Sequence, residues 1–135
     1  MASYFFWDIE NVSFHNLENI MTRLRKTDGH TISYAVYSKI KESRKEVLLE
    51  NGWTLAPTEG ISRNSADNKI KEMIESIMGD TNNLPEKIFI ITEDTGFYKI
   101  SKRIIGNGIP LEIICGTKNP AWIKQLYRLK SNVEK

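Results

Sequence analysis

The chain has 135 residues, a length that fits one domain with its own hydrophobic core. Its net charge of +2 is too small to indicate a nucleic-acid-binding protein, and its single cysteine excludes an intramolecular disulfide framework and a cysteine-rich zinc site. No apolar run is long enough for a signal peptide or a membrane span, so we expect a cytoplasmic protein with no membrane partner.

The segment Tyr4–Asn11 begins with four bulky apolar residues and continues into two acids and an Asn. Such a run predicts a strand buried on both faces, and the period of two places Asp8 and Glu10 on the same side of it. The next elements are expected at residues 13–26 (a helix capped by Ser13), 32–37 (a strand), 39–50 (a helix) and 53–56 (a strand).

A regular apolar stripe from Ile70 to Met78 predicts a third helix, which Ser65 caps and Gly79 ends. The remaining elements are expected at residues 87–92 (a strand), 97–105 (a helix), 110–115 (a strand) and from 120 onward (a helix). Five strands alternating with five helices predict an α/β fold. We expect a three-layer α/β/α sandwich around a mostly parallel five-stranded sheet, with residues 1–135 forming a single domain.

The two most hydrophobic strands, the first and the fourth, should lie side by side in the centre of the sheet. The strand order then reverses between them, and the crevice at their carboxyl ends is the expected binding site. Asp8 and Asn11 follow the first strand, whereas Thr92 and Asp94 follow the fourth. Asp67 lies near the start of the third helix, on the stripe that faces the sheet, so three acids should converge at this edge.

Three carboxylates without matching cations repel one another, and a divalent cation removes that conflict. Oxygen ligands without Cys or clustered His favour Mg²⁺ or Mn²⁺. Metals held in this way polarise a phosphoryl oxygen and generate a hydroxide nucleophile, so phosphodiester hydrolysis is the expected reaction class. Taken singly, Asp67 is better explained as an acid at a helix N-terminus and Asp94 as a cap of the fourth helix, and only the joint placement of all three acids indicates a site.

Basic residues are less informative because a solvated surface explains most of them. Four residues near the carboxyl edge are candidates for contacts with nucleic acid: Lys39, Arg63, Lys69 and Thr92. Lys99, Lys102 and Arg103 lie opposite the apolar stripe of their helix, where we expect a solvated face.

Several motifs together resemble the NYN domains, which are PIN-like metal-dependent ribonucleases. Phe6–Val12 (Phe-Trp-Asp-Ile-Glu-Asn-Val) resembles their first strand, and Ser65–Lys69 is similar to their second acidic motif. Ile90–Phe97 resembles their third motif, and Gly108–Glu112 matches the glycine turn before their last core strand.

The resemblance implies a PIN-like fold and an endoribonuclease that uses Mg²⁺ or Mn²⁺ on single-stranded RNA, with DNA not excluded. It implies metal binding by Asp8, Asp67 and Asp94, and a role for Asn11 in orienting Asp8 or the metal-bound water. A homodimer or a docking partner is compatible with a chain of this size.

The sequence departs from the family pattern at Gly96, where a fourth acid is usual, and at Glu93, where Gly is usual. Glu93, Glu10 or Glu59 could replace the missing acid. Otherwise the chain would be an RNA-binding or regulatory module with little or no catalytic activity. A third alternative, a receiver-like signalling domain, lacks the necessary Asp at the end of the third strand.

Overall fold

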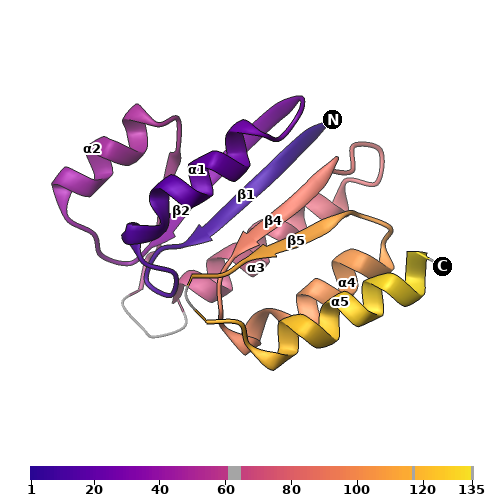
Figure 1. The fold of residues 1–135 in the computed structure, drawn as a ribbon. Helices are drawn as coiled ribbons and strands as arrows, with labels where there is room; N and C mark the ends of the chain where they lie inside the picture. Colours follow the sequence, from indigo (N-terminus) through magenta and orange to yellow (C-terminus); the bar gives the residue numbers. More distant parts are fainter. Residues whose placement is uncertain (61–64, 117, 135) are drawn as a thin grey trace.

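The computed structural model describes residues 1–60, 65–116 and 118–134, and the side chains up to residue 130. In chain order, the elements are β1 (Ala2–Asp8), η1 (Phe14–Asn16), α1 (Leu17–Arg25), β2 (His30–Tyr37), α2 (Glu42–Glu50), β3 (Thr54–Pro57), α3 (Ser65–Gly79), β4 (Lys87–Ile91), η2 (Thr95–Phe97), α4 (Tyr98–Gly106), β5 (Leu111–Ile114) and α5 (Ala121–Glu134) (Figure 1).

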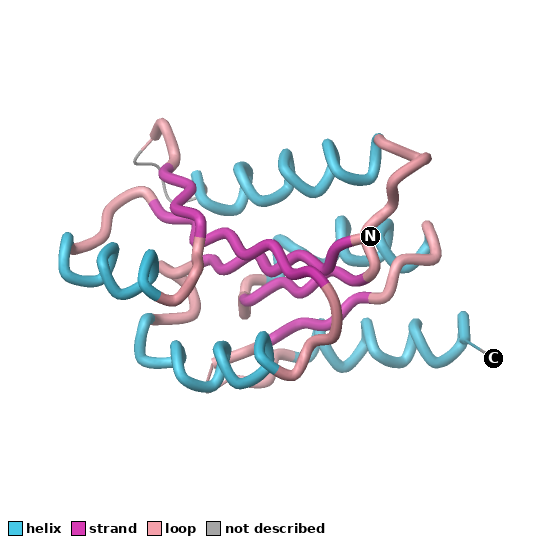
Figure 2. Tube along the Cα trace, turned by 90° about the horizontal axis from the view of Figure 1, so that it is seen from above, coloured by secondary structure: helices cyan, strands magenta, loops and turns pink. Residues whose placement is uncertain are grey.

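The five strands form one sheet in the order β3-β2-β1-β4-β5, and every neighbouring pair is parallel. Helices α1 and α2 cover one face, and α3, α4 and α5 cover the other, so the strands run between two helical layers (Figures 1 and 2). The predicted three-layer α/β fold and the reversal of strand order between β1 and β4 are therefore confirmed. A receiver-like sheet has the order 2-1-3-4-5, so the receiver-like alternative is wrong.

The central strand β1 supplies side chains to the cores on both faces. Phe5 and Trp7 point toward α1 and α2, where Phe5 stacks on Phe89 with ring centres 4.0 Å apart. Phe6 points to the opposite face and packs in the core with residues of α3, α4 and α5, including Ile70. Phe5, Phe6 and Trp7 are all fully buried, which confirms a strand covered on both sides.

The turn after β1 determines how the first acids leave the sheet. The strand ends at Asp8, whose carbonyl accepts a hydrogen bond from the N–H of Val12 at 3.0 Å. The indole N–H of Trp7 donates to the carbonyl of Val12 at 2.7 Å, which fixes the turn against the core. β1 therefore ends before Glu10, which is exposed in the turn, whereas the alternation pattern had assumed a strand that continues through Glu10.

Three helix starts differ from the sequence-based expectations. Ser13 precedes the short helix η1, but its side chain makes no capping hydrogen bond. Helix α2 begins at Glu42, so Lys39 lies in the preceding loop. Ser65 is the first residue of α3 rather than its cap. The predicted end of α2 is confirmed, because Asn51 is its C-cap and Gly52 follows with a φ of +84°.

Side chains of α5 occupy the outer edge of β5. The hydroxyl of Tyr127 accepts a hydrogen bond from the N–H of Ile113 at 3.2 Å and donates one to its carbonyl at 3.3 Å. The ammonium group of Lys130 donates to the carbonyl of Leu111 at 2.6 Å. These contacts satisfy backbone groups that would otherwise be available for pairing with another strand.

Among the described residues, no helix has the length and apolar character needed to cross a membrane.

Candidate active site

A cleft of about 800 Å³ lies at the carboxyl edge of the sheet, where the strand order reverses. It is lined by Asp8, Glu10, Asn11, Ala66, Asp67, Glu93, Asp94 and Thr95. The three predicted acids therefore meet, although β1, α3 and the loop after β4 each supply one of them. This is the position at which open α/β sheets bind ligands.

Asp8 and Asp67 are buried carboxyl groups, with exposed fractions of 3% and 7%. Burial raises the pKa of Asp8 to about 6, although a hydrogen bond with Asp67 opposes the rise, and the charges of Glu10 and Asp94 contribute to it. Burial also raises the pKa of Asp67 to about 8, and the hydrogen bond and negative charge of Asp94 act in the same direction. Asp67 therefore retains its proton through most of the neutral range.

The carboxyl group of Asp67 is hydrogen-bonded to those of both Asp8 and Asp94. Two carboxyl groups can form such a bond only if one of them carries a proton. The three side chains thus lie together in one cleft, and they offer only the oxygen ligands that Mg²⁺ and Mn²⁺ prefer. Within the described part of the chain, no three His, Cys, Asp or Glu side chains already surround a common metal position. The donor set fits such an ion, which would take the place of the shared proton.

Asp94 also serves as the N-cap of η2. Its Oδ1 accepts a hydrogen bond from the N–H of Gly96 at 3.0 Å, and its own N–H donates to the hydroxyl of Thr92 at 3.1 Å. Asp94 therefore does cap a helix, although this helix is the short η2 and not α4, whose N-cap is Phe97. It is compatible with a role in the site, because the cap holds the carboxyl group at the edge of the cleft.

Asn11 joins the ends of β1 and β4. Its side-chain oxygen accepts hydrogen bonds from the hydroxyl of Thr92 at 3.2 Å and from the N–H of Glu93 at 2.6 Å. Its backbone N–H bonds to Asp8 and lowers the pKa of that acid, which partly offsets the effect of burial. Thr92 is fully buried, so the predicted contact of its side chain with nucleic acid is wrong and its hydroxyl positions Asn11 and Asp94 instead.

Glu10 holds the loop between β2 and α2 against the cleft. Its Oε1 accepts hydrogen bonds from the N–H and the hydroxyl of Ser38, and from the N–H of Lys39 at 3.3 Å. Partial burial alone would raise the pKa of Glu10, but these hydrogen bonds lower it below its ordinary value. Glu10 therefore fixes a loop, which argues against the hypothesis that it replaces a metal ligand.

Glu93 plays a similar part on the other side of the cleft. Its Oε2 accepts hydrogen bonds from the N–H groups of Gly116 and Lys118, at 2.9 and 3.0 Å, in the loop between β5 and α5. Its carbonyl accepts one from the indole N–H of Trp122 at 3.1 Å. Nothing in the spacing of these residues indicated the two carboxylate–loop contacts, because both depend on loops that are distant in sequence.

Gly96 occupies the position at which the NYN pattern usually has a fourth acid. A Cβ atom at residue 96 would lie 3.4 Å from Oδ2 of Asp67 and 3.4 Å from Oδ1 of Asp94. These are ordinary van der Waals distances, so a side chain fits there and would approach the cluster of acids.

The predicted basic contacts are dispersed. Lys39 is exposed in the loop that Glu10 holds near the cleft. Lys69 instead lines a separate, smaller cleft with Glu59 and Glu72, which places Glu59 away from the acids. Arg63 lies outside the described residues.

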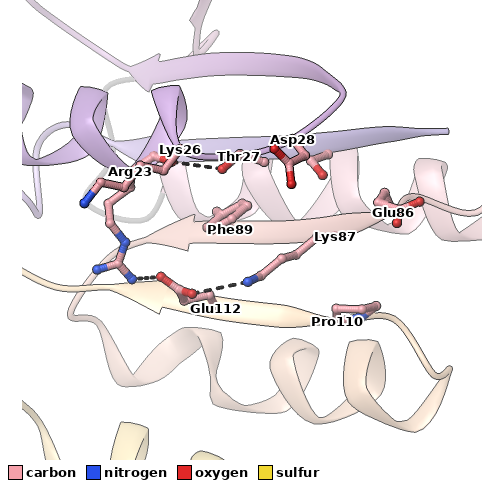
Figure 3. Close-up of a pocket in the computed structure, with 10 residues that line it drawn as sticks. Arg23, Lys26, Thr27, Asp28, Glu86, Lys87, Phe89, Pro110 and Glu112 are labelled. Atoms are coloured by element: carbon pink, nitrogen blue, oxygen red, sulfur yellow. Dashed lines mark hydrogen bonds and ion pairs between the residues drawn. The ribbon is translucent and has the colours of Figure 1, made fainter.

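A second cleft, of about 440 Å³, lies at the opposite, amino edge of the sheet (Figure 3). Its carboxylate Glu112 forms ion pairs with both Arg23 and Lys87, and the ammonium of Lys87 lies 4.7 Å from the centre of the Phe89 ring. The described lining of this cleft thus combines acids with the cations Arg23, Lys26 and Lys87, whereas the described lining of the cleft at the carboxyl edge contains acids and no Lys or Arg.

The fold and the cleft define the class of molecule: an all-parallel α/β sandwich that carries a cluster of aspartic acids at its topological switch point. A scan of models of known protein families and a search of curated proteins both find no match to the chain.

Proposed function

We propose that the protein is a nuclease that uses Mg²⁺ or Mn²⁺ to hydrolyse phosphodiester bonds of single-stranded RNA, and that it has the NYN type of PIN-like fold. The observation that carries the proposal is the convergence of Asp8, Asp67 and Asp94 in one cleft, with Asp8 and Asp67 buried. Burying carboxyl groups together opposes folding unless they bind something, so their placement favours a role in binding a cation.

The chemistry would be divided between the ion and the chain. A bound Mg²⁺ or Mn²⁺ would polarise a phosphoryl oxygen and make water a better nucleophile. Asp8, Asp67 and Asp94 would hold the ion, and Asp67 would release its proton on binding it. Asn11 would keep the ends of β1 and β4 together, so that Asp8 and Asp94 remain a fixed distance apart.

The test is cleavage of an end-labelled single-stranded RNA by the purified protein in Mn²⁺, Mg²⁺ or EDTA, with a DNA of the same sequence beside it. We expect cleavage that needs the metal and is lost in Asp8→Asn and Asp94→Asn. The matched control is Asp80→Asn, which alters an exposed acid just after α3. If Asp8→Asn cleaves as well as the wild type does, the proposed site is wrong.

A second candidate function is an RNA-binding or regulatory module of the same fold without catalysis. The observations that favour it are the absence of a side chain at Gly96 and the engagement of Glu10 and Glu93 by backbone N–H groups. RNA binding without cleavage in any of the three conditions would support this candidate over the nuclease.

A further inference from the structure

A groove of about 770 Å³ lies between α3 and α4, and we call it the α3–α4 groove. The polar residues of its lining include Lys71, Glu75, Lys99, Lys102 and Arg103. Four of these side chains are cations and one is an acid. Ile100 supplies an apolar side chain to the lining. The sequence pattern predicted that Lys99, Lys102 and Arg103 lie on a solvated face of their helix. It could not show that this face forms a concave surface together with α3.

The charge of this groove is poorly compensated. Glu75 is the only acid among the described residues of the lining, and its carboxylate is paired with Arg103. Within the described ranges, Lys71, Lys99 and Lys102 have no carboxylate partner. Three uncompensated lysines in one concavity create a positive potential that favours a polyanion.

Two of the lysines are held in place by aromatic rings. The ammonium of Lys71 lies 5.5 Å from the centre of the Phe97 ring, and that of Lys102 lies 4.7 Å from the centre of the Tyr98 ring. Such cation–π contacts restrict a flexible side chain while leaving its N–H groups able to donate. The positive charges of the groove are therefore partly preorganised.

The groove adjoins the acidic cleft at Gly96. This glycine lines the groove, and a Cβ atom added to it would lie 3.4 Å from a carboxylate oxygen of Asp67 and 3.4 Å from one of Asp94. Because residue 96 is a glycine, it places no side chain of its own between the two depressions. An extended ligand that lies in the groove can thus reach the acids directly.

We propose that the α3–α4 groove binds the phosphodiester backbone of single-stranded RNA on one side of the bond that is cleaved, with Lys71, Lys99 and Lys102 contacting its phosphates. The inference rests on the proposed function for the identity of the polyanion. The groove alone attracts a chain of negative charges, and its contact with a cleft suited to a metal ion favours phosphodiesters over the carboxylates of an acidic peptide.

The test compares two variants that each remove three positive charges. The groove variant is Lys71→Gln, Lys99→Gln and Lys102→Gln, and the control variant is Arg25→Gln, Lys26→Gln and Arg128→Gln, all three of which are exposed and lie outside the groove. Binding of a fluorescent uridine oligomer is followed by anisotropy in EDTA over a series of salt concentrations. Circular dichroism and thermal melting confirm that both variants are folded.

We expect the groove variant to bind at least tenfold more weakly than the wild type and the control variant to bind within about twofold of it. Each lost phosphate contact lowers the slope of log K against log salt by about 0.7 for a single strand, so the groove variant should show a slope shallower by about 2. Equal losses in both variants, or no RNA binding by the wild type, would overturn the groove assignment.

Hydrolysis of a small diester, bis(p-nitrophenyl) phosphate, by the wild type in Mn²⁺ separates the two proposals, because this substrate does not extend from the cleft along the groove. Groove-dependent RNA binding without hydrolysis of the diester or of RNA would support the groove and contradict the nuclease. Hydrolysis together with identical behaviour of the two variants would support the nuclease and overturn the groove.

Discussion

Replacing Asp67 by Asn should stabilise the metal-free protein, and the gain should grow with pH. In the folded protein the pKa of Asp67 is raised from its ordinary value of 3.8 to about 8. The folded state therefore binds this proton more tightly than the unfolded state does, so stability falls as pH rises from the unfolded to the folded pKa and levels off above it. Asn cannot ionise, and its amide can donate to the carboxylates of Asp8 and Asp94, so this loss should disappear.

The magnitude follows from the raised pKa of Asp67. One pKa unit corresponds to about 1.4 kcal/mol, so the roughly three units between the unfolded pKa and pH 7 set an upper limit of about 4 kcal/mol. Because the acids share protons and the effective dielectric constant of a protein is well above that of a dry interior, we expect about 2 kcal/mol. For a chain of this length, that gain raises Tm by roughly 6–10 °C.

The assay is thermal unfolding in EDTA from about pH 5 to about pH 8, for the wild type, Asp67→Asn and the exposed-site control Asp80→Asn. We expect Tm of the wild type and of the control to fall together over this range, and Tm of Asp67→Asn to stay higher at the upper end. Added Mn²⁺ should raise Tm of the wild type but not of Asp67→Asn, because a ligand stabilises only a state that binds it. Parallel curves for the wild type and Asp67→Asn in EDTA would refute the description of Asp67 as a buried, proton-sharing acid.

Three other substitutions test the surroundings of the site. Gly96→Asp should increase Mn²⁺-dependent cleavage relative to Gly96→Asn, because both side chains add an oxygen beside Asp67 and Asp94 but only Asp adds a negative charge. Equal activity of the two variants would show that residue 96 does not need a charge. Glu93→Ala leaves two loop N–H groups without their acceptor and should lower the free energy of unfolding, measured in urea, by about 1–3 kcal/mol. Glu93→Gln keeps a side-chain oxygen as acceptor and should lower it less. Equal losses in the two variants would contradict the role of the acceptor. Tyr127→Phe removes the hydroxyl from the edge of β5 and should cost about 1 kcal/mol while increasing light scattering on heating; an unchanged melt and unchanged scattering would show that the edge needs no such protection.

The sequence was sufficient to predict the sheet and the meeting of the acids. Apolar runs in β1 and β4 identified the central strands, and parallel order then required Asp8 and Asp94 to emerge at one edge. The helical period located Asp67 on the face that turns toward the sheet. These predictions succeeded because an apolar run and a helical period are local features of a single element, and both can be identified in the sequence itself.

Contacts between loops could not be predicted in the same way. The alternation pattern placed Glu10 on a continued strand, but β1 ends at Asp8, and Glu10 lies in the following turn, where its carboxylate accepts hydrogen bonds from Ser38. The concave surface containing Lys99 likewise depends on how α4 packs against α3. Such features depend on the relative positions of separate elements, and no local pattern encodes them.

The three acids of the cleft come from segments far apart in the chain, and this dispersion has a consequence for the lifetime of the protein. A chain that has lost the pairing of β1 with β4, or the docking of α3, no longer holds a complete set of ligands. Under the proposed function, bound metal would therefore suppress partial opening, and the metal-depleted protein would open more often and be digested faster by proteases. Metal supply would then regulate the amount of the protein as well as its activity.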